Sequence, residues 1–320
     1  MRILFFARKK RCTPVPDNIA KGLEKLGQEV KLIRYPKWTR LLGRKLSDTF
    51  LRRVARSFRP DLVLVWKSCI SVSLLAELAG SCKTTLFCHD ALTPPPEELY
   101  KRARLTDIFL LTNSGQLEMY AKAGVKRPVF WPDACDVEVY HPVESPPDYL
   151  RSDVAFIGAP RTTWRQQVLS AVDREFELEI WGSRWEKLAS RYRGVQGREV
   201  LPDQYAAICA GAKVMLGCDG TTGLAHYFSN RTWFTLGCRG FLLTNYSPGL
   251  ETFFENHRHL VWYHSPDECV DLLRHYLPRD DDRLRIAHAG CELVRTKHTY
   301  VHRAQELIKL IDDLPATSKG

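Results

Sequence analysis

The stretch DLVLVWKSCISVSLLAELAGSCKTTLFCH, residues 61–89, decides the fold class. Two short apolar runs, Asp61–Trp66 and Thr84–His89, enclose a segment at residues 69–79 whose leucines have helical spacing. A strand, a helix and a second strand make the unit of a parallel sheet, because a parallel connection needs a crossover of a dozen or more residues. The stretch therefore predicts a pair of parallel strands with a covering helix.

The same alternation extends in both directions from this stretch. Helical segments are expected at 17–27, 44–58, 96–104 and 114–123. The further expected strands are Arg2–Ala7, Glu29–Tyr35, Asp107–Thr112, Val129–Trp131, Asp153–Gly158, Glu177–Gly182, Lys213–Cys218 and Gly240–Asn245. A proline-rich break at 141–149 divides the series, since proline is excluded from helix interiors and central strands. We therefore expect an α/β protein with two Rossmann-like, doubly wound parallel-sheet domains that face each other across a cleft.

Composition narrows the class of protein. The chain has 320 residues, 44% hydrophobic and 26% charged, which suits a globular protein of about two domains. Its ten cysteines form no C-x-x-C pair, so we expect reduced thiols in a cytoplasmic protein and neither a disulfide scaffold nor a zinc ribbon. The first residues carry only a five-residue apolar run before a basic cluster, and no window approaches ~18 apolar residues. Neither a secretory signal nor a membrane span is expected.

Positive charge is concentrated at the start of the chain. Residues 1–60 hold 17 Lys and Arg against 4 Asp and Glu, whereas the remaining 260 residues hold 30 against 33. The whole net charge of +10 therefore arises in the first sixty residues. Such a surplus either forms a solvated surface or attracts an anionic partner, and both interpretations stay open at this point.

Several common motifs are missing from the sequence. It contains no G-x-x-x-x-G-K-[ST] loop, no G-x-G-x-x-G after the first strand, no G-x-S-x-G elbow and no H-E-x-x-H helix. These absences argue against P-loop nucleotidases and dinucleotide-dependent dehydrogenases. No D-x-D metal signature ends an expected strand, and no metal site is expected.

Three segments of the second half suit an anion. IGAPR (157–161), SNR (229–231) and SPGLE (247–251) each lead into an expected helix start, where backbone N–H groups and guanidinium groups can bind a diphosphate. All three follow strands, and ligands of open parallel sheets bind beyond the carboxyl ends of strands. The candidate residues of this site are Gly158, Arg161, Arg165, Ser229, Asn230, Arg231, Pro248, Gly249, Leu250 and Glu251.

Four motifs together resemble a known family. They are SNR (229–231), GCRGFLLT (237–244), PGLE (248–251) and HTYVHRA (298–304). In this combination they resemble the C-terminal domain of the CgeB-like (spore maturation protein B) glycosyltransferases, which are of GT-B type. Upstream, DVEVYHP (136–142) is similar to the D-x-x-x-F-x-P segment that closes the N-terminal domain of many GT-B enzymes. The resemblance is strong from about residue 150 to 305 and weaker before.

This resemblance implies an activity and a division of labour. Residues 1–145, with a crossover helix at about 299–320, would bind the acceptor, and residues 150–298 would bind a nucleotide sugar. The implied reaction is metal-independent transfer of a sugar from a nucleoside diphosphate sugar, without a further cofactor. Related retaining enzymes have a Glu at the positions of Phe234 and His226, so their usual pair of donor-binding acids is absent.

Candidate acceptor and catalytic residues lie in the first half. His89 and Asp90 end the fourth expected strand, where similar enzymes often have a His or Asp that contacts the sugar or acceptor. A histidine there suits proton transfer near neutral pH, and an aspartate can orient it or act as the base. The alternative is structural, with Asp90 capping the next segment and His89 hydrogen-bonded in a loop. Behind the first strand, the expected acceptor-binding cations are Arg8, Lys9, Lys10 and Arg11.

The segment Trp38–Phe58 has apolar residues at three-to-four spacing with arginines and lysines between them. It predicts either a core helix with a basic outer face or a helix that lies on an anionic membrane. An anionic acceptor, whether a glycan, a lipid-linked glycan or DNA, fits the charge of this half.

Two other classes of function stay open, both on the same fold. One is a non-catalytic protein that binds sugar nucleotides or nucleic acid, and the other is a sugar-nucleotide epimerase or hydrolase. We expect the protein to be located in the cytoplasm. Peripheral contact with the inner surface of the membrane is an alternative that stays open.

Overall fold

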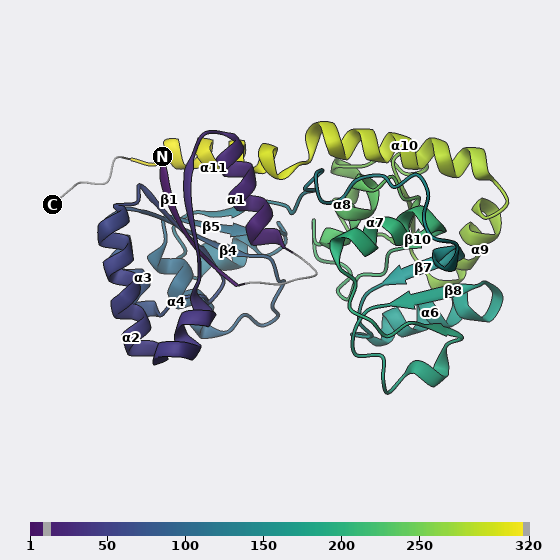
Figure 1. Ribbon diagram of the computed structural model, residues 1–320, viewed down its shortest axis with the longest axis horizontal. Coiled ribbons are helices and arrows are strands. Elements are labelled where there is room, and N and C mark those ends of the chain that lie inside the picture. Colours follow the sequence, from purple (N-terminus) through teal and green to yellow (C-terminus); the bar gives the residue numbers. More distant parts are fainter. Residues whose placement is uncertain (9–13, 316–320) are drawn as a thin grey trace. The chain divides into compact units, whose positions relative to one another are not determined.

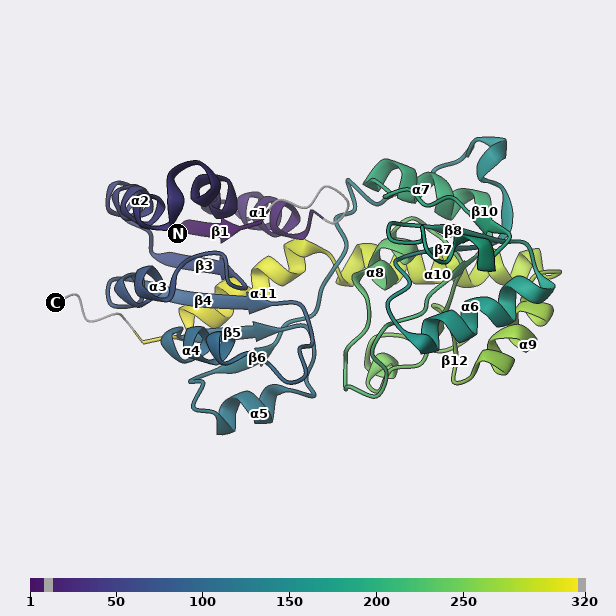
Figure 2. The same ribbon diagram turned by 90° about the horizontal axis from the view of Figure 1, so that it is seen from below.

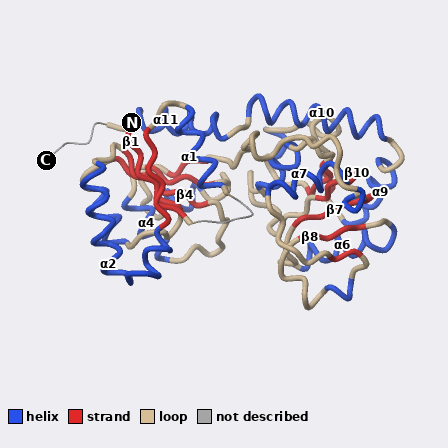
Figure 3. Tube along the Cα trace, in the orientation of Figure 1, coloured by secondary structure: helices blue, strands red, loops and turns tan. Residues whose placement is uncertain are grey.

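The computed structural model describes residues 1–8 and 14–315, without the side chains of residues 36–38 and 44. The chain forms two units, one comprising Met1–Asp133 and the segment from Tyr300, the other Ala134–Thr299. Each unit contains one six-stranded sheet flanked by helices (Figures 1 and 3). The strands of both sheets pair in parallel, and the predicted class of two doubly wound parallel sheets is therefore confirmed.

The first sheet has the strand order β2-β1-β3-β4-β5-β6. Its strands are β1 (Arg2–Ala7), β2 (Glu29–Arg34), β3 (Leu62–Trp66), β4 (Lys83–Cys88), β5 (Ile108–Leu111) and β6 (Pro128–Phe130). Every residue of β3 and β5 is buried, as expected for strands covered on both faces. Each strand matches an expected one within a residue or two at either end.

Helices cover both faces of this sheet (Figures 1 and 2). They are α1 (Val15–Lys25), α2 (Tyr35–Phe58), α3 (Val72–Ala79), α4 (Glu97–Leu105), α5 (Leu117–Lys122) and α11 (Tyr300–Asp312). Helices α1 and α11 lie together on one face, and α2, α3 and α4 lie on the other (Figure 1). The contact of α1 with α11 requires Gly22, since a Cβ there would lie 2.5 Å from the carbonyl oxygen of Tyr300.

The second sheet has the order β12-β11-β10-β7-β8-β9. Its strands are β7 (Ser152–Ile157), β8 (Leu178–Trp181), β9 (Gly194–Val195), β10 (Ala212–Leu216), β11 (Leu242–Asn245) and β12 (Val261–Tyr263). The two edge strands, β9 and β12, were not among the expected strands. They have two and three residues, too few for an apolar pattern to mark them.

Helix α6 packs against α9 in this unit, and α8 packs against α10. The helices are α6 (Thr163–Glu175), α7 (Pro202–Gly211), α8 (Asn230–Gly237), α9 (Pro266–Tyr276) and α10 (Asp280–Lys297), with 3₁₀ turns η1 (Asp148–Leu150), η2 (Ala189–Arg191) and η3 (Leu250–Thr252). The core between them and the sheet is apolar, with Trp185 as its largest fully buried side chain.

Residues 134–145 pack with the second unit, although the proline-rich break had suggested that they close the first. The amide of Cys135 donates to the carbonyl of His298 at 3.0 Å, and the ring of Tyr140 stacks on Phe234 with centroids 3.9 Å apart. Side-chain packing therefore joins this segment to the second unit before the prolines are reached.

No helix among the described residues is long and apolar enough to cross a membrane. The cysteines that the structure describes are all free and buried.

Candidate functional site

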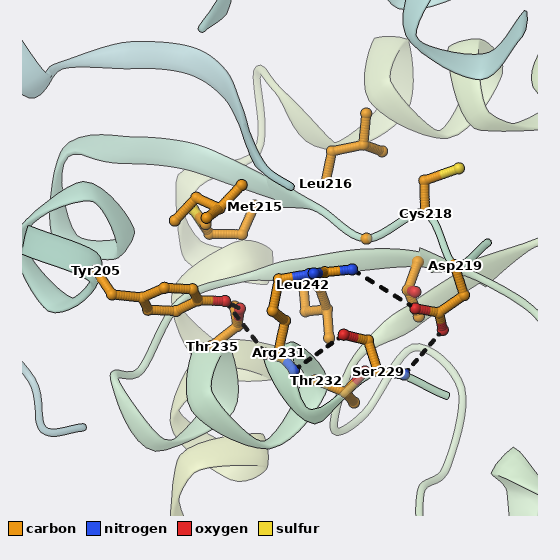
Figure 4. Close-up of a pocket in the computed structure, with 13 residues that line it drawn as sticks. Tyr205, Met215, Leu216, Cys218, Asp219, Ser229, Arg231, Thr232, Thr235 and Leu242 are labelled. Carbon is orange, nitrogen blue, oxygen red and sulfur yellow. Dashed lines mark hydrogen bonds and ion pairs between the residues drawn. The ribbon is translucent and has the colours of Figure 1, made fainter. Parts of the chain in front are cut away.

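The loops that follow β7, β10 and β11 lie side by side at the carboxyl edge of the second sheet, since these strands are neighbours. A small pocket, partly open to solvent, lies between the end of β10 and the start of α8 (Figure 4). Its polar lining comes mainly from Tyr205, Asp219, Ser229, Arg231, Thr232 and Thr235. Two of the three segments expected to bind an anion, 157–161 and 229–231, therefore contribute to one pocket.

Asp219 organises this edge. Its backbone N–H donates to Asn245 Oδ1 at 2.6 Å, and its Oδ2 accepts from the N–H of Ser229 at 3.1 Å. Burial raises the pKa of the Asp219 carboxyl, while the nearby charge of Arg231 acts in the opposite direction. Neither Asp219 nor Asn245 was among the expected site residues, although both stand at strand ends, where the same rule could have found them.

Arg231 extends its guanidinium toward Asp219, across the pocket (Figure 4). The two groups are 3.9 Å apart, and the arginine side chain is 30% exposed. Ser229 is the N-cap of α8, with its Oγ accepting from the N–H of Arg231 at 3.2 Å. The cation at this helix start is thus partly compensated by a buried carboxylate and keeps access to solvent.

Arg165, an expected diphosphate ligand, is instead fully engaged with the backbone. Its Nε and Nη2 donate to the carbonyl of Cys218 at 2.8 and 2.5 Å, and its Nη1 donates to the carbonyl of Ala159 at 2.5 Å. The residue is 3% exposed, and burial together with the charge of Arg231 lowers its pKa to about 10. These contacts make Arg165 a positioning residue that ties the loops after β7 and β10 together.

Arg161 has the opposite environment. It is exposed in the same loop, one residue before Thr162, the N-cap of α6, and forms no ion pair with any described residue. Gly158 lies where β7 and β8 approach each other, since a Cβ at Gly182 would be 2.3 Å from the Gly158 oxygen. An exposed arginine beside a capped helix start can bind an anion.

The third segment, 247–251, makes a tight turn. Gly249 has φ +90° and lies against the ring of His226, so that a Cβ there would be 2.5 Å from two ring atoms. Pro248 accepts the backbone N–H of His226 at 2.6 Å, and Leu250 is fully buried. The exposed carboxylate of Glu251 accepts a hydrogen bond from the Tyr246 hydroxyl at 3.1 Å.

Position 234 belongs to the core. Phe234 is 1% exposed, stacks on Tyr140, and meets the ring of Tyr205 edge-on at 6.1 Å. Asn230, by contrast, is half-buried at the first position of α8. An aromatic stack therefore occupies position 234, where the resemblance to retaining glycosyltransferases had implied a Glu.

At the carboxyl edge of the first sheet, His89 and Asp90 lie beside Lys67. The Lys67 ammonium forms an ion pair with Asp90, and His89 Nε2 is 3.4 Å from Asp90 Oδ1. The Trp66 and His89 rings have centroids 4.6 Å apart. Lys67 has φ +51°, a conformation that costs a non-glycine residue about 1 kcal/mol and that clusters at functional sites. The expected pair is thus part of a larger polar cluster.

Asp133 is a buried acid at the same edge, three residues after β6. It is 6% exposed, and its Oδ1 has no hydrogen-bond partner among the described residues. Burial, then the negative charge of Asp90, raises the pKa of Asp133 to about 7, against the opposing charges of Lys67 and Arg303. At neutral pH both the protonated and the ionised form of this carboxyl are therefore populated.

Arg8 is exposed directly after β1, and its charge acts on the thiol of Cys69. Lys9, Lys10 and Arg11 lie outside the described residues. Within the described residues, no three His, Cys, Asp or Glu side chains are grouped to hold a metal ion.

Comparisons with known proteins concern the family and the fold of the chain. Residues 161–309 match the model of a family described as glycosyl transferase-like. No curated protein matches the sequence. The family match covers most of the second unit, including the segments 229–231 and 247–251 and, at its first residue, Arg161.

Solved structures extend the comparison to the whole chain. Anabaena HepE, in a complex with UDP and glucose, has a TM-score of 0.72 at 11% identity, with 98% of this chain and 100% of that chain covered. The fold is that of the GT-B glycosyltransferases. The sucrose-phosphate synthase of Thermosynechococcus elongatus gives 0.71 at 11% identity, covering 99% and 100%. An alpha-glucosyltransferase in a complex with UDP and DNA containing an HMU base gives 0.69 at 11% identity, covering 98% and 100%.

Replacing Arg165 tests its role as a positioning residue. Arg165→Ala leaves two buried carbonyls without their charged donor, so we expect a loss of about 2 kcal/mol or more in the free energy of unfolding. The measurement is unfolding of Arg165→Ala in urea, compared with the parent protein. Arg161→Ala, in the same loop but exposed, is the matched control and should unfold like the parent. Equal stability of all three proteins would contradict the assignment.

Asp133 makes stability depend on pH. Its folded-state pKa, about 7, lies above the ordinary value of 3.8, so its contribution to stability is present at low pH and is lost as pH rises toward 7. Between pH 5 and pH 8 the parent protein should lose about 2–3 kcal/mol relative to Asp133→Asn. Unfolding of both proteins in urea across this range measures the difference, and parallel pH curves would rule it out.

Proposed function

We propose that the protein is a glycosyltransferase that moves a sugar from a nucleoside diphosphate sugar to an acceptor, without a metal ion. The observation that carries the proposal is the carboxyl edge of the second sheet, where the exposed Arg161 and the partly exposed Arg231 lie at two helix starts. It lies within the segment that matches the glycosyl transferase-like family. Solved proteins of the same fold were captured with UDP, which supports a nucleoside diphosphate as the ligand.

In this proposal, Arg161 and Arg231 bind the diphosphate. Both lie beside helix N-termini, whose unpaired N–H groups and dipole favour negative charge. As the bond between the sugar and the diphosphate breaks, charge develops on the leaving oxygen, and fixed cations stabilise it without a metal. Arg165 and Asp219 hold the two loops in place.

Glu251 is the carboxylate proposed to bind a hydroxyl of the donor's sugar or ribose. It is exposed next to the tight turn at Gly249 and is oriented by the Tyr246 hydroxyl. Gly249, with φ of +90° and the His226 ring packed against it, makes the tight turn that precedes Glu251. This arrangement would replace the acids that are absent at positions 226 and 234.

The first unit is proposed to bind the acceptor, with His89 and Asp90 as the reacting residues. The ion pair with Lys67 fixes Asp90, and the Trp66 ring fixes the imidazole plane. From there the pair can orient an acceptor hydroxyl or accept its proton. The exposed Arg8 and the basic surplus of residues 1–60 favour an anionic acceptor: an acidic glycan, a lipid-linked glycan or DNA. The same surplus supports peripheral contact with an anionic membrane or with nucleic acid, in a cytoplasmic protein.

A non-catalytic protein that binds sugar nucleotides is the second candidate, favoured by the aromatic stack at Phe234. Binding of a nucleotide sugar without turnover would support it. Turnover of the donor without an added acceptor would point to an epimerase or hydrolase.

A panel of UDP, GDP, dTDP, ADP and CMP, with their sugar conjugates and EDTA, tests the donor site. A ligand at ~100 times its dissociation constant adds about 2.7 kcal/mol and should raise the melting temperature by several degrees. Arg161→Ala and Arg231→Ala should each weaken binding about tenfold or more, because each removes a charge-assisted contact to phosphate. Lack of a shift with any nucleotide would refute the proposed donor class.

His89→Ala and Asp90→Asn test the acceptor side. Each should lower kcat by roughly 10²–10⁴ and leave the affinity for the donor unchanged, because the donor is bound by the second unit. Release of the nucleoside diphosphate gives the rate, and calorimetry gives the affinity. Rates equal to those of the parent protein would favour the structural interpretation of this pair.

A further inference from the structure

Helix α2 has two halves that serve different purposes. Its second half packs on the first sheet through Leu51, Ala55 and Phe58, which are all less than 9% exposed. Backbone geometry separates the halves at Gly43, whose φ of +71° and ψ of 169° interrupt the helix. The sheet therefore accounts for the apolar residues of the second half alone.

Leucines next to this bend face solvent. Leu41 is 65% exposed, Leu42 is 39% and Leu46 is 63%, all within three residues of Gly43. Only six large apolar side chains are exposed among the described residues, and these are three of them. Exposed apolar residues that are clustered rather than scattered mark an interaction surface.

The charge around the bend has one sign. Arg40 and Lys45 are exposed and form no ion pair with any described residue. Farther along the helix, by contrast, Arg52 and Arg56 share Glu77. The single acid of α2, Asp48, is buried and accepts hydrogen bonds from Ser71 and Tyr35. The bend thus presents leucines and cations without an exposed acid from its own helix.

We propose that the bend of α2 (residues 40–46) docks on the surface of an anionic lipid bilayer. The leucines enter the boundary between headgroups and acyl chains, and Arg40 and Lys45 meet the lipid phosphates, a combination typical of interfacial helices. This inference rests on the proposed function, in which the first unit binds the acceptor, and it places that acceptor at a membrane. It assigns a lipid-linked glycan as the acceptor class.

Two other occupants fit these residues less well. Nucleic acid binds through cations and aromatic stacking, and leucines contribute to neither. A second copy of this chain would bring two equally charged patches together across a two-fold interface, with no exposed acid of α2 to compensate them. An anionic bilayer matches both the apolar and the charged part of the surface.

Co-sedimentation with vesicles tests the proposal without any donor or turnover. Vesicles of 30% phosphatidylglycerol in phosphatidylcholine should bind the full chain at 0.1 M salt, and vesicles of phosphatidylcholine alone should bind it much less. Leu41→Ser/Leu46→Ser should weaken binding at least about tenfold, because each leucine loses its burial in the membrane. Arg40→Glu/Lys45→Glu should weaken binding to the anionic vesicles alone.

Leu284→Ser is the matched control, since Leu284 is exposed to the same degree (66%) but lies on α10 of the second unit. It should bind vesicles like the parent protein. Melting curves of all variants, which change only exposed side chains, should coincide and so exclude misfolding.

Three results would overturn the proposal: no vesicle binding at low salt, binding that the leucine variant retains in full, or equal weakening by Leu284→Ser. Binding to duplex or single-stranded DNA that depends on Arg40 and Lys45, without vesicle binding, would assign the surface to nucleic acid. Dimerisation lost in the leucine variant would assign it to a second copy. A nucleotide-induced melting shift without vesicle binding defeats this inference alone, whereas vesicle binding without any nucleotide shift defeats the proposed function.

Discussion

Hydrogen bonds from the Arg165 guanidinium to the carbonyls of Ala159 and Cys218 hold the carboxyl edge of the second sheet together. A buried cation is tolerated there because backbone oxygens take the place of water. Cys218 leads directly into Asp219, which binds the end of β11 and the start of α8. The positions of the exposed Arg161 and the partly exposed Arg231 therefore depend on a third arginine that is itself buried.

The first sheet has a carboxyl edge of different chemistry. Lys67, which has a positive φ, lies there with His89 and Asp90, and burial raises the pKa of the nearby Asp133 to about 7. The second sheet presents cations at helix starts. In the proposed function, the first edge exchanges protons with the acceptor hydroxyl and the second binds the diphosphate of the donor.

The fold could be predicted because each central strand is an apolar run between helical segments, a pattern that leaves few alternatives. The edge strands β9 and β12 escaped prediction because pairing with a neighbour, not sequence pattern, makes them strands. At the candidate site, the sequence pattern pointed to Arg161 and Arg165 but could not distinguish their roles. Arg161 and Arg165 differ by four positions in sequence, and only the path of the loop after β10 decides that one is exposed and the other buried. Asp133 was missed because burial, which no local pattern signals, gives it its properties.

The packing of α1 against α11 has a consequence for synthesis. The first unit draws its last helix from residues 300–312, after the whole second unit, so its sheet emerges from the ribosome well before the helix that covers one of its faces. The second unit is continuous in sequence and can complete its core as soon as it has been translated. During translation the order of completion is thus reversed relative to the order of the chain, and the face of α1 around Gly22 stays uncovered until the end.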